Sequence, residues 1–346
     1  MLNELSRRAF LSDAALVSAA SALKLHSATH ASLVPSPPRR ANFDQDWRFL
    51  LGDPQDAYSP AFMDAAWNPV HLPHDWSIEG AFSEDAPAKG NGAYLPTGIG
   101  WYRKSFTLPT SAAGKQVELE FDGVYERSEV WINGVSLGMR PYGFISFAYD
   151  LTPHLAPHGR PNHVAVRVDN SLQPNCRWYS GSGIYRHTWL RIVNPLHIAR
   201  SGVYITTPLV SAHNAHIEFA TVVHNQGNIP VSFDLLTEIV DAEGTVVQQT
   251  ATSHDLAGST EDTFDGSMVV ASPSLWSPSS PSLYQARSTL RQHGAAVDQE
   301  TTAFGIREAV FDVNLGLLLN GEHVKMNGVC IHGDGGSVGT AVPERV

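Results

Sequence analysis

The residues best suited to ligand chemistry lie between Asn175 and Leu190, in the sequence NCRWYSGSGIYRHTWL. Trp178 and Tyr179 provide flat apolar faces that can pack against a polyhydroxylated ring, and Arg177 and Arg186 provide fixed donors for hydroxyl groups. The glycines of the SGSG run permit sharp backbone turns between these side chains. The stretch therefore indicates a binding surface for a ligand rich in hydroxyl groups.

A structural interpretation of the same stretch stays open at this point. Its apolar residues are also compatible with a strand that re-enters a β-sandwich core, and its arginines with ion pairs to nearby carboxylates. The core residues would then be Trp178, Ile184 and Tyr185, and Arg177 and Arg186 would pair with Glu126 or Glu129.

A second polar cluster, IHGDGGSVG, runs from Ile331 to Gly339. His332 and Asp334 form a titratable pair flanked by glycines, in a loop that can approach a substrate closely. A histidine and an aspartate two residues apart also occur in ordinary surface loops. The pair is a candidate substrate contact because glycines flank it. The spacing of the two residues alone does not identify a site.

Glycoside hydrolysis needs two carboxyl groups on either side of the scissile bond. The acidic residues of this sequence show no such pair in a suitable frame. Glu126 and Glu129 are three apart on a predicted strand and face opposite sides, which favours surface roles. The sequence also lacks a G-x-S-x-G elbow, a P-loop and a dinucleotide fingerprint.

The amino-acid composition limits the kinds of partner and cofactor that the protein can bind. The chain has 346 residues and a formal net charge of −11, with lysines and arginines scattered singly, so nucleic acid is an unsuitable partner. Cys176 and Cys330 fall in different predicted domains, and we expect both thiols to be free. The 16 histidines are dispersed, and we expect neither a metal nor another cofactor.

The first residues carry an export pattern. Arg7 and Arg8 precede Phe10-Leu11 and a small-residue apolar run from Ala14 to Leu25, which is typical of a twin-arginine signal over residues 1–31. That run is too short for a permanent membrane span. Residues 32–41 contain PSPPRR and predict a stiff extended tether. We therefore expect an exported protein, periplasmic or extracellular.

Residues 42–195 predict a β-sandwich of jelly-roll type. Val117, Leu119 and Phe121 alternate with acidic residues, which is the period of a half-buried strand. Asn133-Gly134 between two apolar runs predicts a tight hairpin. A sustained 3.6-residue apolar period is missing, so the fold class is all-β.

Residues 196–308 predict a seven-stranded immunoglobulin-like sandwich, because strand patterns recur about every ten residues between turn signals. The last stretch, residues 309–346, has hairpin character at Asn320-Gly321 and is too small to fold alone. The strands expected in the second sandwich lie around residues 217–223, 233–240, 245–250 and 283–290.

Eight motifs in order resemble glycoside hydrolase family 2, the family of β-galactosidases, β-glucuronidases and β-mannosidases. The resemblance runs from about Asn42 to Val346. The motifs are LPHDW (Leu72 to Trp76), GIGWYRKSF (Gly98 to Phe106), VYERSEVWINGVSLG (Val124 to Gly138), YDLTPHL (Tyr149 to Leu155), RWYSGSGIYRHTWL (Arg177 to Leu190), LWSPSSPSLY (Leu275 to Tyr284), FGIRE (Phe304 to Glu308) and LLLNGEHVKMNGVCIH (Leu317 to His332).

The resemblance implies a jelly-roll sugar-binding domain, an immunoglobulin-like domain and then a (β/α)₈ barrel that carries the active site. Residues 309–346 would be the truncated start of that barrel. The family uses a retaining mechanism with two glutamates on later barrel strands, and both are expected beyond Val346. The resemblance thus implies no catalytic residue in this chain and no hydrolysis by it alone.

The resemblance also assigns substrate contacts. His332 matches a histidine that borders the sugar site, and residues 177–181 lie in the loop that reaches over the barrel mouth. Asn91 corresponds to a residue that touches substrate. Gly333 departs from the pattern, because similar members have a second histidine there. The implied substrate-binding set is Asn91, Arg177, Trp178, Tyr179, His332 and Asp334.

The GSGIYR and IHGDGG forms resemble the β-galactosidase-like branch, which implies a β-glycoside as substrate. One alternative is a stand-alone carbohydrate-binding or scaffold protein made of two sandwiches. Another is a divided enzyme with a separately encoded barrel, or a homo-oligomer. Val329 and Ile331, on the expected first barrel strand, would form an unpaired apolar edge and promote association.

Overall fold

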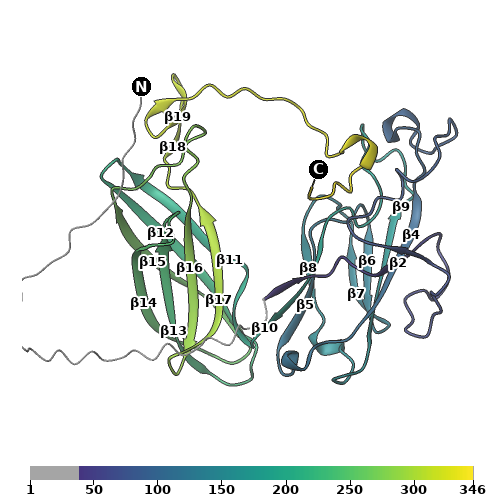
Figure 1. Ribbon diagram of the computed structural model, residues 1–346, viewed down its shortest axis with the longest axis horizontal. Helices are drawn as coiled ribbons and strands as arrows, with labels where there is room; N and C mark the ends of the chain where they lie inside the picture. Colours follow the sequence, from purple (N-terminus) through teal and green to yellow (C-terminus); the bar gives the residue numbers. More distant parts are fainter. Residues whose placement is uncertain (1–38, 346) are drawn as a thin grey trace, which may run out of the picture. The chain divides into compact units, whose positions relative to one another are not determined.

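Strands dominate residues 39–345, the part of the chain that the computed structural model describes (Figure 1). The predicted signal, residues 1–31, lies outside the described residues, as does most of the predicted tether. Arg40 and Ala41, the last tether residues, belong to the first strand instead. The first strand of the first domain therefore begins slightly before the expected boundary at residue 42.

The first domain is a sandwich of two antiparallel sheets. One sheet has the order β1-β10-β5-β8 and the other the order β3-β2-β4-β9-β6-β7. The strands are β1 (Arg40–Asn42), β2 (Trp47–Leu51), β3 (Asn68–Val70), β4 (Gly98–Phe106), β5 (Gln116–Phe121), β6 (Ser128–Ile132), β7 (Val135–Arg140), β8 (Phe147–Asp150), β9 (Asn162–Asn170) and β10 (Thr188–Val193).

The core of this sandwich lies between the two sheets. Val117, Leu119 and Phe121 on β5 are fully buried in it, as the alternating pattern predicted. Trp47 from β2 and Tyr102 from β4 fill the centre from the opposite sheet. Two rigid sheets packed in this way hold the loops at their ends in fixed positions.

The predicted hairpin is present. Ile132 of β6 pairs with Val135 of β7, and the turn residues Asn133 and Gly134 have φ values of 50° and 84°. Positive φ at both turn positions matches the right-handed twist of the strands, which explains the Asn-Gly pair.

Gly134→Ala is expected to lower the free energy of unfolding by about 1 kcal/mol, because a side chain at positive φ is strained. A β-carbon there would also lie 3.2 Å from Cδ of Pro60. Urea denaturation of the two proteins tests this. Gly333→Ala is a suitable control, since a β-carbon at that glycine meets no atom within 4 Å and its φ is not positive.

The second domain is a seven-stranded sandwich, as predicted, with sheets β11-β12-β15 and β14-β13-β16-β17. The sequence patterns located four of these strands and missed three: β11, β15 and β17. The strands are β11 (Leu196–Val210), β12 (Asn214–Asn225), β13 (Val231–Val240), β14 (Val246–Leu256), β15 (Thr260–Ala271), β16 (Tyr284–Gln292) and β17 (Ala295–Phe304).

The last described residues begin with a small sheet of β18 (Ala309–Asp312), β19 (Gly316–Leu319) and β20 (Glu322–His323). The expected strand around Val329 and Ile331 is absent from the described chain, and both side chains are 84% exposed. A strand needs a neighbour for its backbone hydrogen bonds, and none lies beside this segment. The two apolar side chains are thus exposed and unpaired as expected, the segment forms no strand in the described chain, and the barrel start stays a prediction.

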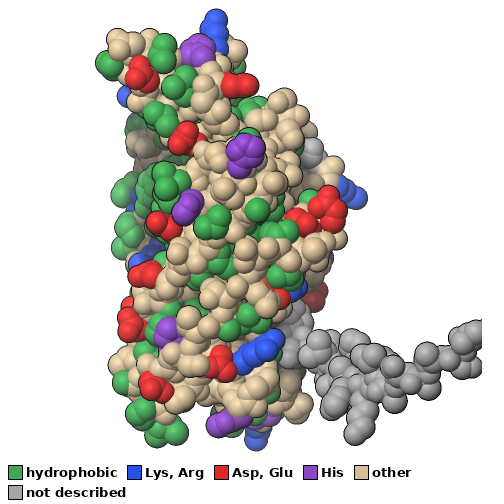
Figure 2. All heavy atoms as spheres, turned by 90° about the vertical axis from the view of Figure 1, so that its left-hand side faces the viewer, with side chains coloured by type: hydrophobic (Ala, Val, Ile, Leu, Met, Phe, Trp, Pro, Cys, Tyr) green, Lys and Arg blue, Asp and Glu red, His purple; other side chains and the backbone are tan. Residues whose placement is uncertain are grey.

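The surface in view (Figure 2) has no large basic patch, in agreement with the scattered lysines and arginines of the sequence. Figure 2 shows, on the face that includes the second sandwich, acidic, basic and histidine side chains interspersed among apolar ones. Among the described residues, no helix is long and apolar enough to cross a bilayer. Cys176 and Cys330 are both unpaired thiols.

Candidate functional site

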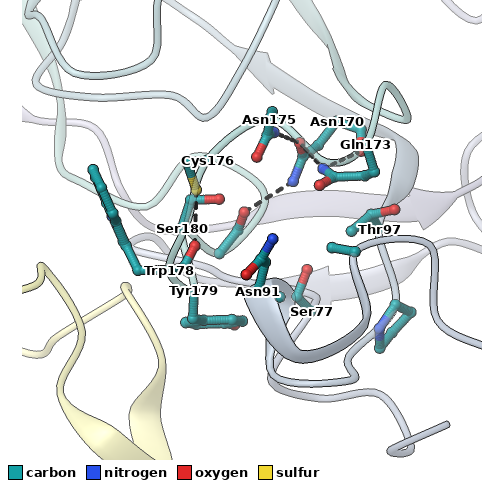
Figure 3. Close-up of a pocket in the computed structure, with 14 residues that line it drawn as sticks. Ser77, Asn91, Thr97, Asn170, Gln173, Asn175, Cys176, Trp178, Tyr179 and Ser180 are labelled. Atoms are coloured by element: carbon teal, nitrogen blue, oxygen red, sulfur yellow. Dashed lines mark hydrogen bonds between the residues drawn. The ribbon is translucent and has the colours of Figure 1, made fainter. Parts of the chain in front are cut away.

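A small pocket lies at one end of the first sandwich, where the chain leaving β9 meets the short 3₁₀ helix η1 (Lys89–Gly92). Its volume is about 10 Å³, which is room for one water molecule or one hydroxyl group. The lining contains no charged side chain. It consists of Ser77, Ala88, Asn91, Gly92, Pro96, Thr97, Asn170, Gln173, Asn175, Cys176, Trp178, Tyr179, Ser180 and Gly181 (Figure 3).

Amide side chains build one wall of the pocket. Nδ2 of Asn170, at the end of β9, donates to the carbonyl of Gly181 at 3.0 Å and to Oγ of Ser182 at 2.7 Å. Its Oδ1 accepts from Gln173 Nε2 at 2.7 Å and from Asn175 Nδ2 at 2.6 Å. Figure 3 shows these amides gathered opposite Trp178. Since the network satisfies Asn170 fully, it fixes the shape of residues 170–182.

Trp178 stands at the rim, with 38% of its surface exposed. Its ring centroid lies 5.0 Å from that of His332, and the two planes are tilted by 40°. The two rings therefore form a partly exposed aromatic corner beside the neutral pocket. This is the arrangement that a sugar ring needs, with an apolar face for its C–H groups and polar groups at its edge.

Asp75 lies directly behind the pocket and is 2% exposed. Its Oδ1 accepts the N–H groups of Ser77 at 3.1 Å and Ser182 at 2.9 Å. Its Oδ2 accepts the hydroxyl of Tyr179 at 2.6 Å, and the N–H and hydroxyl of Thr340 at 3.0 and 3.1 Å. Burial and this carboxylate raise the pKa of Tyr179 far above its usual range, so its hydroxyl stays protonated as a donor.

Backbone pairing places Asp75 there. The N–H of His74 donates to the carbonyl of Ile184 at 2.8 Å, and that of Trp76 to Ser182 at 3.1 Å. The His74 ring contacts the Tyr102 hydroxyl through Nδ1 at 2.7 Å. Burial lowers the pKa of His74, while Glu79, 3.2 Å from Nε2, opposes that shift. The LPHDW motif was thus a signal of the site, but its spacing does not reveal what Asp75 binds.

The structure brings three predicted site residues together, since Asn91, Trp178 and Tyr179 all line the pocket. His332 joins them through Trp178. Arg177 is exposed and outside the lining. Asp334 is exposed as well, and its Oδ1 accepts the N–H of Gly336 at 3.1 Å.

The alternative interpretation of the stretch holds in part. Ile184 is fully buried in the core and Tyr185 is nearly so. The expected ion pairs are wrong, because Glu126 pairs with its neighbour Arg127 and Arg186 lies over the ring of Tyr185. A carboxylate next to an arginine in sequence reaches it with less loss of side-chain freedom than a distant one.

The pocket lining has donors and acceptors for neutral hydroxyl groups but no carboxyl group to act as acid or nucleophile. Within residues 39–345, no group of three histidine, cysteine or acidic side chains is arranged to hold a metal ion.

Two family models match the chain. The model of the glycosyl hydrolases family 2 sugar binding domain matches residues 42–196, and that of glycosyl hydrolases family 2 matches residues 196–307. Together they account for both sandwiches. The chain belongs to glycoside hydrolase family 2.

Family members of known sequence and structure are similar over nearly the whole chain. The β-galactosidase BoGH2A of Bacteroides ovatus is 45% identical over 93% of this chain, and a putative β-glucuronidase of Formosa agariphila is 39% identical over 87%. A family 2 member from Bacteroides cellulosilyticus superposes with a TM-score of 0.86 at 36% identity, over 89% of this chain.

The chain spans only part of these relatives. It covers 38% of the Bacteroides ovatus protein, 28% of the Formosa agariphila protein and 40% of the solved Bacteroides cellulosilyticus chain. The similarity therefore establishes family and fold for the two sandwiches.

Proposed function

We propose that this protein takes part in the cleavage of β-galactosides, with residues 39–345 forming a sugar-contact surface and not the catalytic carboxyl pair. The observation that carries the proposal is the neutral pocket beside Trp178. A pocket of about 10 Å³ admits one hydroxyl group of a sugar whose ring lies over the tryptophan.

The neutral lining favours galactosides over glucuronides. A uronic acid carries a carboxylate, which needs a cationic side chain or several directed N–H groups when it is desolvated. The pocket lining offers amides and hydroxyl groups but no lysine, arginine or histidine. Similarity to a β-galactosidase agrees with this preference, although relatives named β-glucuronidases are also similar.

The test is hydrolysis of a chromogenic β-galactoside by the purified 346-residue chain, beside calorimetric titration with methyl β-galactoside and methyl β-glucuronide. We expect no hydrolysis, binding of the galactoside and weaker binding of the glucuronide. Hydrolysis by this chain would contradict the assigned roles. Hydrolysis that appears only after a family 2 barrel domain is added would support them and identify a divided active site.

The second candidate is a stand-alone carbohydrate-binding protein, because the site has binding groups without a carboxyl pair. Binding of galactosides that an added barrel domain leaves unchanged, without hydrolysis, would favour it. Export, predicted from Arg7 and Arg8, stays part of the proposal, and a reporter fused after residue 31 would test it.

A further inference from the structure

One buried carboxylate gathers three segments that are distant in sequence. Asp75 holds its own turn segment through Ser77, residues 177–182, here called the sugar loop, through Tyr179 and Ser182, and the segment Gly333–Val342 through Thr340. We propose that Asp75 is a positioning residue that fastens this last segment, here called the C-terminal latch, to the sugar loop. Its role in sugar binding rests on the function proposed above.

The latch follows the small sheet of β18, β19 and β20 in the chain, and Thr340 brings it into contact with Asp75 of the first domain. Its 3₁₀ turn η4 (Gly336–Val338) delivers Thr340 to Asp75, and Thr340 is 8% exposed there. Both polar groups of Thr340 bond the same oxygen, Oδ2, that accepts the Tyr179 hydroxyl. Release of Thr340 would therefore change the hydrogen bonding of the oxygen that holds Tyr179, a residue that lines the pocket.

Two glycines clear the space for this contact. A β-carbon on Gly181, in the sugar loop, would overlap Oγ1 of Thr340 and crowd Asp75. A β-carbon on Gly339, in the latch, would overlap Oδ2 of Asp75. Both have positive φ, of 68° and 63°. A side chain at Gly181 or Gly339 would push the latch away from Asp75 and the sugar loop, so this contact requires glycine at both positions.

Energetics favour a closed latch. A buried carboxylate is costly unless hydrogen bonds satisfy it. None of the ion pairs among the described residues joins Asp75 to a lysine or arginine, so its compensation comes from five hydrogen bonds. Release of Thr340 would remove two of them from one oxygen. Closure also fixes the start of the latch, and so holds His332 beside Trp178.

The first experiment needs no sugar. Asp75→Asn replaces one acceptor oxygen by an NH₂ group, which opposes the donors of Thr340 or those of the two serines. Hydrogen–deuterium exchange of the intact chain, followed in peptides covering residues 336–342, should be at least tenfold faster in the variant. Unchanged exchange in those peptides would overturn the latch.

A matched control is available in the same domain. Asp44 is also 2% exposed, and its Oδ1 accepts the N–H and hydroxyl of Thr188 at 2.7 and 3.1 Å. Asp44→Asn should accelerate exchange around Thr188 and leave residues 336–342 at their native rate. Equal acceleration of residues 336–342 in both variants would mean that Asp75 acts only through general stability, and would overturn a specific latch.

A second variant leaves both partners chemically intact. Gly339→Ala should displace the latch and accelerate exchange of residues 336–342 as Asp75→Asn does, while residues outside the latch and sugar loop keep their native exchange rates. Thr340→Ser, which retains the hydroxyl, should preserve slow exchange, and Thr340→Val should lose part of it. Native exchange in Gly339→Ala would also contradict the geometry.

Titration with methyl β-galactoside then tests the link to the site. Asp75→Asn and Gly339→Ala should each weaken binding at least threefold. The loss of affinity in the double variant should be no greater than the larger of the two single losses, because both changes release the same contact. Native affinity in an open-latch variant would overturn the positioning role. If the unaltered chain binds no galactoside, the proposed function fails, while the exchange experiment still decides the latch.

Discussion

Trp178→Ala is expected to weaken binding of methyl β-galactoside by roughly 30-fold, or about 2 kcal/mol, as truncation of a central tryptophan contact does elsewhere. The ring offers the only tryptophan face in the pocket lining and is already held beside His332, so little ordering cost accompanies binding. Isothermal titration calorimetry at constant pH and salt measures the change.

A good control is Tyr204→Ala, which removes an aromatic side chain that is more exposed than Trp178 and lies on β11 of the second sandwich. Its affinity for the galactoside should match that of the unaltered chain. Equal loss in both variants would point to a general effect of aromatic removal. Native affinity in Trp178→Ala would remove the rim tryptophan from the sugar site.

Acid should destabilise the protein through His197 on β11. This side chain is 1% exposed, its Nδ1 contacts the carbonyl of Asn194 at 2.8 Å, and its Nε2 lacks a hydrogen-bond partner. Burial, assisted by the nearby Arg191, lowers its pKa from 6.5 to about 3. The folded protein therefore keeps this imidazole neutral, with Nδ1 as the donor.

The sign follows from proton binding. Between pH 6.5 and about 3 the unfolded chain protonates His197 and the folded chain does not, so stability falls as the pH falls through this window. Each pH unit removes up to about 1.4 kcal/mol, and acidification to pH 4 should remove roughly 3 kcal/mol. Urea denaturation at a series of pH values measures the loss.

His197→Asn isolates the effect, because its amide can still donate to Asn194 but does not titrate. The variant should have a clearly smaller slope between pH 6.5 and 4, with a remainder from buried His74, whose pKa is also lowered, and exposed His213→Asn should retain the native slope. Burial raises the pKa of Asp298, which works in the opposite direction, so the difference between variants is more informative than the native slope. Identical slopes in His197→Asn and the native chain would refute this assignment.

Much of the architecture was readable from local patterns. Alternation of Val117, Leu119 and Phe121 predicted β5 because one sheet face must be buried, and the Asn133-Gly134 pair predicted its turn because both positions have positive φ. The seven strands of the second sandwich were expected as a number, but β15 was missed. Its sequence, TEDTFDGSMVVA, is mostly polar and exposed, so its pairing with β12 and not its own pattern makes it a strand.

By itself, then, the sequence determined the all-β class, the two sandwiches and the family, and it pointed to the two aromatic residues that line the candidate pocket, since each depends on residue type and short spacing. Only the tertiary structure decided that Arg177 lies outside the pocket lining, that Val329 and Ile331 form no strand in the described chain, and that Asp75 and Thr340 meet. The contact between Asp75 and Thr340 joins residues that are far apart in the sequence. Packing of the chain and the space left by two glycines make it possible, and no local sequence pattern predicts it.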